Sequence, residues 1–264
     1  MKEKLFSIGE ISKAKGITVK ALRFYEKIGL LMPFYTDPVT KYRYYSMNQF
    51  WKLDIIKASR IMDISPKEIK TVLDKKDTDF VLDYMDRQKE NAREKILDIN
   101  RRIFVMNAFQ RYVQTSKESI SKSEVYYKDI VERHIITIAV DSHINKESAY
   151  PVYAKACKIV EENRLLNTFE NGFICGVTNN QFVPVELFCS VGTDDSSETS
   201  LLSSIQAGSY LCVCFNEHNA REQQDKLCRY IEENKLAPKQ VLLVLLMADL
   251  FKTDLQSIEM QMLI

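Results

Sequence analysis

Several features are scarce in this chain, and each shortage excludes a class of protein. Only seven glycines occur in 264 residues, and they form no glycine-rich loop of the kind that holds phosphate. The HExxH and GxSxG patterns of common hydrolases are missing as well, so the chain is not expected to be an enzyme. The longest apolar run, Val241 to Ala248, has the length of a strand, and no membrane-spanning helix is expected.

Cysteine and histidine are also few and are poorly placed for a metal site. All six cysteines lie between Cys157 and Cys228, and His134, His143 and His218 lack the spacing of metal ligands. The amino-terminal residues are rich in lysine and glutamate and contain no signal-peptide core. We therefore predict a cytoplasmic protein with free thiols and no cofactor.

What the chain does have is an uneven distribution of charge. Residues 1–76 carry 16 lysines and arginines against 8 acids, residues 77–120 carry 8 of each, and residues 121–264 carry 13 against 20. A basic segment suits a polyanion, whereas an acidic tail repels one. These changes in charge divide the chain into three predicted parts, residues 1–76, 77–120 and 121–264, and favour nucleic acid as the partner of the first part.

Four helix starts follow one another in the basic head, which we define as residues 1–76. Ser7, Ser46 and Ser65 each stand three residues before a Glu or Gln, which is the capping-box pattern. Thr18 is a simpler cap. Helices are predicted at about 8–15, 19–28, 47–62 and 66–73.

A basic, tyrosine-rich hairpin separates the second helix from the third. Segment 33–45, PFYTDPVTKYRYY, turns at Asp37-Pro38, and alternation places Lys41 and Arg43 on one face of the returning strand. This order of elements predicts an all-α winged helix-turn-helix head whose second helix enters the major groove of DNA. The predicted DNA-contacting residues are Thr18, Lys20, Arg23, Lys41, Tyr42, Arg43, Lys57 and Arg60.

The segment SIGEISKAKGITVKALRFYEKIGLL, followed by DPVTKYRYYS and a Leu/Ile-rich helix, resembles the N-terminal domain of the MerR family of transcription regulators. The resemblance covers Phe6 to about Leu73. It implies that Tyr25 also contacts a phosphate and that a homodimer binds a pseudo-palindromic site in double-stranded promoter DNA. It further implies that the activated dimer bends and untwists the promoter so that RNA polymerase can engage it.

A long helix without proline or glycine is predicted from Asp79 to Val113. Residues at alternating spacings of 3 and 4 form a heptad seam typical of a coiled coil. The seam runs through Leu82, Met85, Lys89, Ala92, Ile96, Ile99, Ile103, Met106, Gln110 and Val113. The polar segment 115–122 is predicted to be a linker. The resemblance implies that the helix pairs antiparallel with its copy, and a helix packed on its own domain remains the alternative.

Beyond residue 122 strands and helices alternate. After a first strand at 124–130, the order strand-helix-strand-strand occurs twice. The first set is predicted at 134–140, 150–163, 172–177 and 187–191, and the second at 209–215, 218–233, 240–248 and 258–264. This repetition predicts a duplicated α+β effector domain with both helices on one sheet.

This layout resembles the multidrug-sensing, gyrase-inhibitor-like effector domain of some MerR-family activators. The resemblance implies a pocket for a lipophilic aromatic or cationic compound, with a buried glutamate at the position where this chain has Leu243. Aromatic faces attract cations, and a carboxylate in an apolar cleft strengthens that attraction. The predicted ligand-binding residues are Tyr153, Phe173, Glu186, Tyr210, Phe215 and Asp249, with Asp254 as a further candidate acid.

Two other functions stay open. Cys212 and Cys214 lie two apart on a predicted strand and point the same way, which allows a metal- or redox-responsive regulator, although buried cysteine is common in cores. Residues 78–156, where metal-sensing relatives carry cysteines, contain none. The other alternative is a DNA-binding protein whose tail binds a protein partner. The length of the tail and its own core pattern favour a small-molecule sensor.

Overall fold

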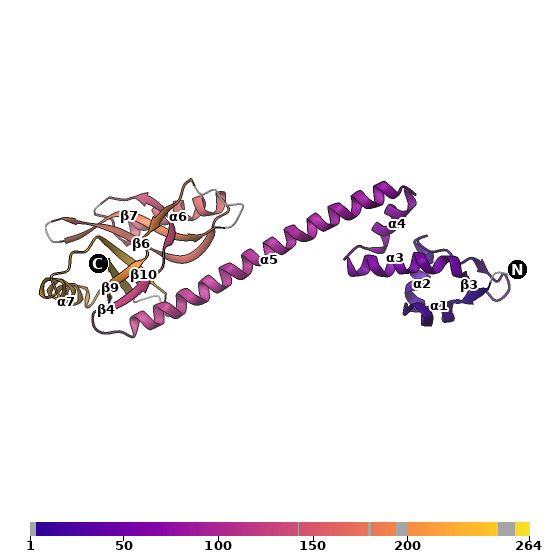
Figure 1. The fold of residues 1–264 in the computed structure, drawn as a ribbon, viewed down its shortest axis with the longest axis horizontal. Coiled ribbons are helices and arrows are strands. Elements are labelled where there is room, and N and C mark those ends of the chain that lie inside the picture. Colours follow the sequence, from indigo (N-terminus) through magenta and orange to yellow (C-terminus); the bar gives the residue numbers. More distant parts are fainter. Residues whose placement is uncertain (1–3, 142, 179–180, 194–199, 248–256) are drawn as a thin grey trace. The chain divides into compact units, whose positions relative to one another are not determined.

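The chain forms two compact units that share one long helix. A computed structural model describes residues 4–141, 143–178, 181–193, 200–247 and 257–264. The units comprise Met1–Lys95 and Ile96–Ile264, and the division falls inside α5 (Thr78–Ile120) (Figure 1). No helix within the described ranges combines the length and apolarity needed to cross a membrane.

The helices of the first unit begin and end close to their predicted positions. They are α1 (Ile8–Lys15), α2 (Val19–Lys27), α3 (Phe50–Ile61) and α4 (Pro66–Asp74). Ser7 forms the predicted capping box with Glu10, and the Thr18 hydroxyl accepts a hydrogen bond from the Ala21 amide at 3.1 Å. A 3-10 turn, Met47–Gln49, occupies the first residues of the helix predicted to begin at 47.

A small antiparallel sheet completes this unit, so the head is not all-α as predicted. Strands β1 (Leu5–Ser7), β2 (Tyr35–Thr36) and β3 (Arg43–Ser46) pair in the order β1-β3-β2. The prediction missed β1 because this short strand runs directly into the cap of α1. Lys41 precedes β3 and has a φ of 58°, so it belongs to the turn and does not alternate with Arg43 along the strand as predicted.

The first turns of α5 belong to the core of the first unit. Ile11, Leu22 and Leu53 are fully buried in that core, and Tyr84 of α5 packs against them. The Tyr84 hydroxyl also donates a hydrogen bond to Glu68 of α4 at 2.8 Å. The start of α5 is thereby fixed to the helices of the head.

The other end of α5 corrects the predicted linker, because the helix continues to Ile120. Ser116 and Ser119 are buried although the segment is polar. The Ser116 hydroxyl accepts a hydrogen bond from the Met247 amide at 3.1 Å, and Ser119 accepts one from Lys128 at 3.2 Å. These serines meet polar groups of the second unit, which is why their polarity does not end the helix.

The second unit contains an eight-stranded antiparallel sheet in the order β4-β9-β11-β10-β6-β7-β5-β8. Its elements are β4 (Tyr126–Ile130), β5 (Arg133–Ala139), α6 (Lys146–Glu162), β6 (Leu166–Thr178), β7 (Gln181–Gly192), β8 (Ser203–Ile205), β9 (Gly208–Phe215), α7 (Ala220–Glu233), β10 (Gln240–Leu246) and β11 (Ser257–Leu263). The predicted strand-helix-strand-strand sets appear as β5-α6-β6-β7 and β9-α7-β10-β11. The sets meet where β6 pairs with β10. The short edge strand β8 was not predicted.

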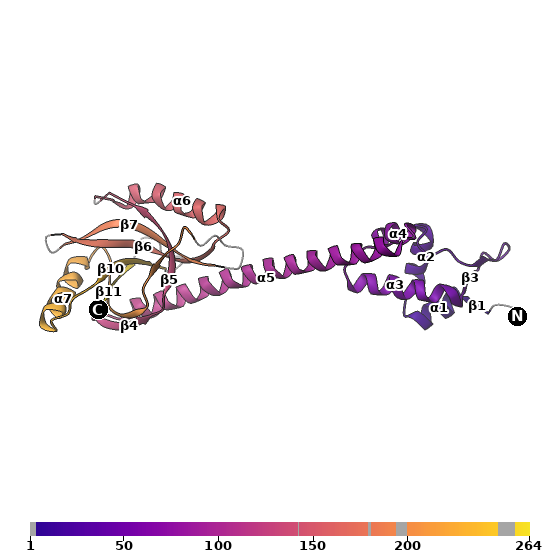
Figure 2. The ribbon, with the colours of Figure 1, turned by 45° about the horizontal axis from the view of Figure 1, so that its top comes forward.

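Helices α6 and α7 cover the same face of this sheet. Phe173 of β6 packs both with the cluster beneath α6 and with the cluster beneath α7, which places the two helices on its side. The last turns of α5 contact the opposite face through Ser116 and Ser119. Figure 2 shows α6 above β6 and β7, and the end of α5 beside β4 on the other side.

Candidate DNA-binding and effector sites

The surface of α2 displays a polar and basic face beside a buried one. Leu22 and Tyr25 are buried in the head core, whereas Thr18, Lys20 and Arg23 are exposed. These three residues lie at the cap and in the first half of the helix. Side chains at that end of a recognition helix are the ones that reach base edges in the major groove.

Tyr25 differs from the other predicted DNA contacts because its ring is part of the core. It is 2% exposed, whereas the neighbouring Phe24 is 42% exposed. Burial gives Tyr25 a packing role in the head. A hydrogen bond from its hydroxyl to phosphate stays a prediction.

The hairpin between α2 and β3 has an ordered turn. The Asp37 carboxylate accepts hydrogen bonds from the amides of Val39 and Thr40, both at 2.8 Å. The Thr40 and Val39 amides hold the pKa of this carboxyl below its usual value. The turn leaves Lys41 and Tyr42 exposed, so a cation and a phenol project from its end.

Arg43 joins the hairpin to α2. Its Nε donates to the Glu26 carboxylate at 2.6 Å, and both side chains are partly exposed. The ion pair fixes the guanidinium beside α2 while its Nη groups keep donor capacity for an anion. The hairpin and α2 are therefore parts of one surface.

The two remaining predicted DNA contacts lie on α3. The Lys57 ammonium donates to the Lys15 carbonyl at 2.7 Å, where it complements the C-terminal end of α1. Arg60 is exposed near the end of α3. Lys57 thus has a partner within the head, and a contact of either residue with DNA stays a prediction.

In the second unit, two of the six predicted ligand-binding residues come together. Tyr153 of α6 and Phe173 of β6 pack in one apolar cluster with Leu187 and Cys189 of β7. Leu243 stands opposite Phe173 in the β10–β6 register and shares its face of the sheet. The described side chains of this cluster are apolar apart from the phenol and the thiol.

The other predicted ligand residues do not belong to the cluster around Tyr153. Tyr210 is fully buried in the cluster on the opposite face, where its hydroxyl donates to the Gln206 carbonyl at 2.7 Å. Phe215 packs in the cluster beneath α7, against which Phe173 also packs. Glu186 pairs with Ala139 and Ile174 and is partly exposed. Asp249 and Asp254 lie outside the described residues.

A buried charged cluster that the sequence reasoning missed lies between the sheet and α5. Glu259 of β11 is 1% exposed, lies 2.9 Å from the Lys128 ammonium and accepts hydrogen bonds from Tyr126 and Gln261. Burial opposes its ionisation, but Lys128 and hydrogen bonds from Ser119, Tyr126 and Gln261 outweigh burial and lower the pKa of Glu259.

Sequence alternation explains why this cluster was missed. Glu259 and Gln261 alternate with Met260 and Met262, a pattern typical of a strand with one solvated face. Here α5 covers that face. The pair of serines near the end of α5 was the one sequence feature that could have indicated a polar partner for this face, but it had been assigned to a linker.

Burial holds several of the cysteines as thiols. Burial raises the pKa of Cys175 and of Cys189 to about 12 and that of Cys214 to about 11. A thiolate is the reactive and metal-binding form, so these environments disfavour both roles. Within the described ranges, no three His, Cys, Asp or Glu side chains gather as a metal site would require.

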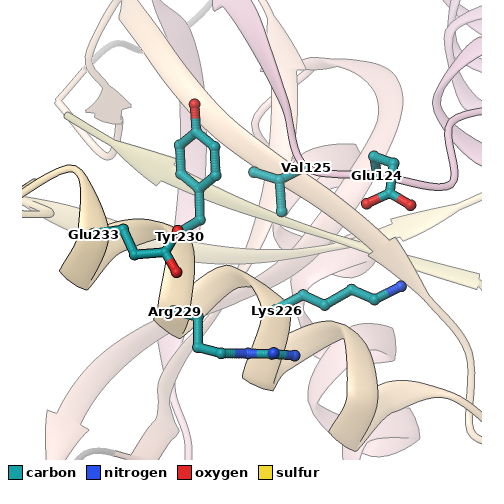
Figure 3. Close-up of a pocket in the computed structure, with 6 residues that line it drawn as sticks. All are labelled: Glu124, Val125, Lys226, Arg229, Tyr230 and Glu233. Carbon is teal, nitrogen blue, oxygen red and sulfur yellow. The ribbon is translucent and has the colours of Figure 1, made fainter.

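A surface cavity of about 460 Å³ lies between α7 and the start of β4. Figure 3 shows the six side chains that surround it. They are Glu124, Val125, Lys226, Arg229, Tyr230 and Glu233. Two cations and two acids balance one another, and none of the predicted ligand residues is present.

Comparisons with known proteins agree with this arrangement. Residues 7–45 match the model of the MerR family regulatory protein. The multidrug-efflux transporter 1 regulator of Bacillus subtilis is 28% identical over 249 residues, which cover 89% of this chain and 88% of that protein. An uncharacterised HTH-type transcriptional regulator of Pseudomonas aeruginosa is 31% identical over 114 residues, 41% of this chain and 80% of its own length.

The comparison with solved structures finds a similar chain in the cryo-EM structure of an EcmrR–DNA complex. It has a TM-score of 0.42 and 21% identity, and covers 97% of this chain and 98% of that one.

Proposed function

Because the chain belongs to the MerR family of DNA-binding transcription regulators and is not an enzyme, we propose that it is a ligand-responsive promoter activator. It binds double-stranded promoter DNA as a homodimer, detects a lipophilic aromatic or cationic compound through its second unit and then distorts the promoter for RNA polymerase. The bacterial origin of the similar regulators supports the cytoplasm as its location.

The observation that carries the proposal is the single basic surface made by α2 and the hairpin. Arg23 and Lys41 are exposed on it, and the Arg43–Glu26 ion pair ties its two parts together. In this proposal α2 enters the major groove and the hairpin acts as the wing that contacts the adjacent backbone.

The dimer is proposed to form through α5. Ile96, Ile99, Ile103 and Met106 of the predicted seam are each at least half exposed on the described chain. An apolar stripe of this length on a helix is typical of a partner-covered surface. Antiparallel pairing with a second copy would cover it and hold two heads at a fixed spacing.

The proposed effector subsite lies beneath α6, around Tyr153 and Phe173. Their apolar cluster suits a lipophilic compound, and aromatic rings attract a cation when it is desolvated. The similarity to the multidrug-efflux transporter 1 regulator supports an effector of this class. Pro151 interrupts the backbone hydrogen bonding of α6, which favours movement of this helix when a ligand enters.

Thermal unfolding in the presence of added compounds tests the effector proposal. Tetraphenylphosphonium and the uncharged triphenylphosphine oxide are the probes, and a ligand at 100 times its Kd stabilises the folded state by about 2.7 kcal/mol. Tyr153→Ala is expected to abolish the stabilisation. Tyr150→Ala is the matched control, because Tyr150 lies on the same helix and is 73% exposed.

The pattern of results identifies the effector class. Stabilisation by the phosphonium alone indicates that charge is recognised, and stabilisation by both probes indicates a site that selects for apolar rings. Equal stabilisation of the Tyr153→Ala and Tyr150→Ala proteins would show that the compound does not bind beneath α6. No stabilisation by either probe would contradict this effector class and leave the DNA-binding role intact.

A further inference from the structure

The last turns of α5 are hydrogen-bonded to the end of β10. The Tyr112 hydroxyl donates to the Leu245 carbonyl, and the Ser116 hydroxyl accepts from the Met247 amide at 3.1 Å. Ser116 is 1% exposed. These contacts involve backbone groups of the strand, so a displacement of β10 changes the hydrogen bonds of α5 directly.

The adjacent strand β6 contacts α5 through a β-bulge. The β6–β7 register shifts between Asn167 and Asn171, and Phe169 has a φ of 69°, which is rare for a residue with a Cβ atom. The Asn167 side chain accepts a hydrogen bond from the Phe169 amide at 2.6 Å, and the Asn171 side chain donates one to the Phe169 carbonyl at 3.0 Å. The bulge turns the Phe169 ring edge-on to Phe109 of α5, with centroids 5.0 Å apart.

A chain of buried and partly buried polar contacts joins this bulge to the end of α5. It runs through Glu170, Arg133, Gln261, Glu259, Lys128 and Ser119. Arg133 donates to Gln261 at 3.1 Å, and the Lys128 ammonium lies 2.9 Å from Glu259. Loss of one charged member leaves the charge of its partner unpaired in a largely buried site. Such a network therefore favours a change between two discrete arrangements over a gradual one.

We propose that this junction, formed by Phe109, Tyr112, Ser116 and Ser119 of α5 with their partners on β4, β6 and β10, is the switch that couples the second unit to DNA binding. Strands β6 and β10 also carry Phe173 and Leu243 on their other face. The proposed effector subsite and α5 therefore act on opposite faces of the same two strands. This inference rests on the proposed function, for which it supplies the route of regulation.

The test uses DNA as the probe, so that it does not depend on the effector. Coupling between two sites is reciprocal, and operator binding must therefore alter the junction. Hydrogen–deuterium exchange is measured by mass spectrometry on the full chain, free and with an operator duplex selected from a random library. In the wild-type protein, the peptides containing Phe169 and Met247 are expected to change their exchange rates by about fivefold or more.

Matched serine variants locate the coupling. Ser116→Ala removes the acceptor of the Met247 amide. Ser190→Ala removes another buried hydroxyl on the network side of the sheet, which bonds the His134 carbonyl and not α5. The response of the Phe169 peptide, which Ser116 does not touch, is expected to fall below about twofold in Ser116→Ala and to persist in Ser190→Ala. Tyr112→Phe is the second variant should Ser116→Ala fail to fold.

Two results would overturn the proposal. One is an unchanged exchange rate at both wild-type peptides on operator binding. The other is a Phe169 response in the junction variants equal to that of Ser190→Ala. Failure of tetraphenylphosphonium to bind would instead remove the proposed effector class, and the exchange result would still decide whether the junction is a switch.

Discussion

At the scale of single residues, Glu259 makes the stability of the second unit depend on pH. Its folded pKa is lowered below the value of about 4.3 for an unperturbed glutamate. The Lys128 pairing therefore stabilises the fold fully above that pH and is lost as the pH falls through the lower folded pKa. Glu259→Gln is expected to lower the free energy of unfolding at pH 7 by about 2–3 kcal/mol, because Lys128 keeps its charge without a partner.

Calorimetric unfolding measured from pH 3 to pH 7 checks this prediction. The difference between wild type and Glu259→Gln should shrink as the pH drops below about 4.3. Glu132→Gln is the control, since Glu132 is exposed and its replacement should change stability by less than about 0.5 kcal/mol. A difference that stays constant across the range would show that Glu259 is not ionised in the folded protein.

Arg43 permits a second residue-scale prediction, about DNA. Arg43→Ala should weaken operator binding by about 1–3 kcal/mol if it contacts a base, or lower the salt slope by about one unit if it contacts a phosphate. Fluorescence anisotropy over a range of salt concentrations distinguishes these outcomes. Arg93→Ala is the matched control, because Arg93 pairs with Glu90 on α5 outside the proposed DNA surface. Equal binding by the two variants at every salt concentration would contradict the wing contact.

At the scale of elements, the seam of α5 predicts the oligomeric state. Ile103 and Leu97 are both at least half exposed, but Ile103 lies in the predicted heptad seam and Leu97 on the opposite side of the helix. Ile103→Glu places a charge from each copy in the apolar contact and should weaken dimerisation by about 100-fold, or about 2.7 kcal/mol. Leu97→Glu should have little effect. Sedimentation equilibrium measures both, and equal dissociation constants would place the dimer contact elsewhere.

The elements also show what the sequence could predict. Helices α1, α2 and α4 begin at their predicted residues because N-terminal caps such as Ser7 and Thr18 act locally. The predicted end of α5 was wrong because Ser116 and Ser119 are polar yet buried. They are buried because they hydrogen-bond to groups outside this helix, which a local pattern does not reveal. Tyr210 and Phe215 were assigned to one pocket. They lie an odd number of residues apart on β9, and such a spacing places two side chains on opposite faces of the sheet. Which side holds a ligand depends on the helices that cover it.

At the scale of the whole molecule, the proposed dimer predicts a fixed spacing between operator halves. If α5 pairs with its copy as proposed, the two heads engage half-sites on the same side of the duplex. Inserting five base pairs between the halves rotates one by about half a helical turn of 10–10.5 base pairs, so a single head should bind. Operator affinity is then expected to fall by about 100-fold, the advantage of two linked contacts over one. Replacing five central base pairs without changing the length is the control. A monomer, or two heads on flexible linkers, would bind the inserted and replaced duplexes equally, and electrophoretic mobility shift titrations of the full chain against both would expose either case.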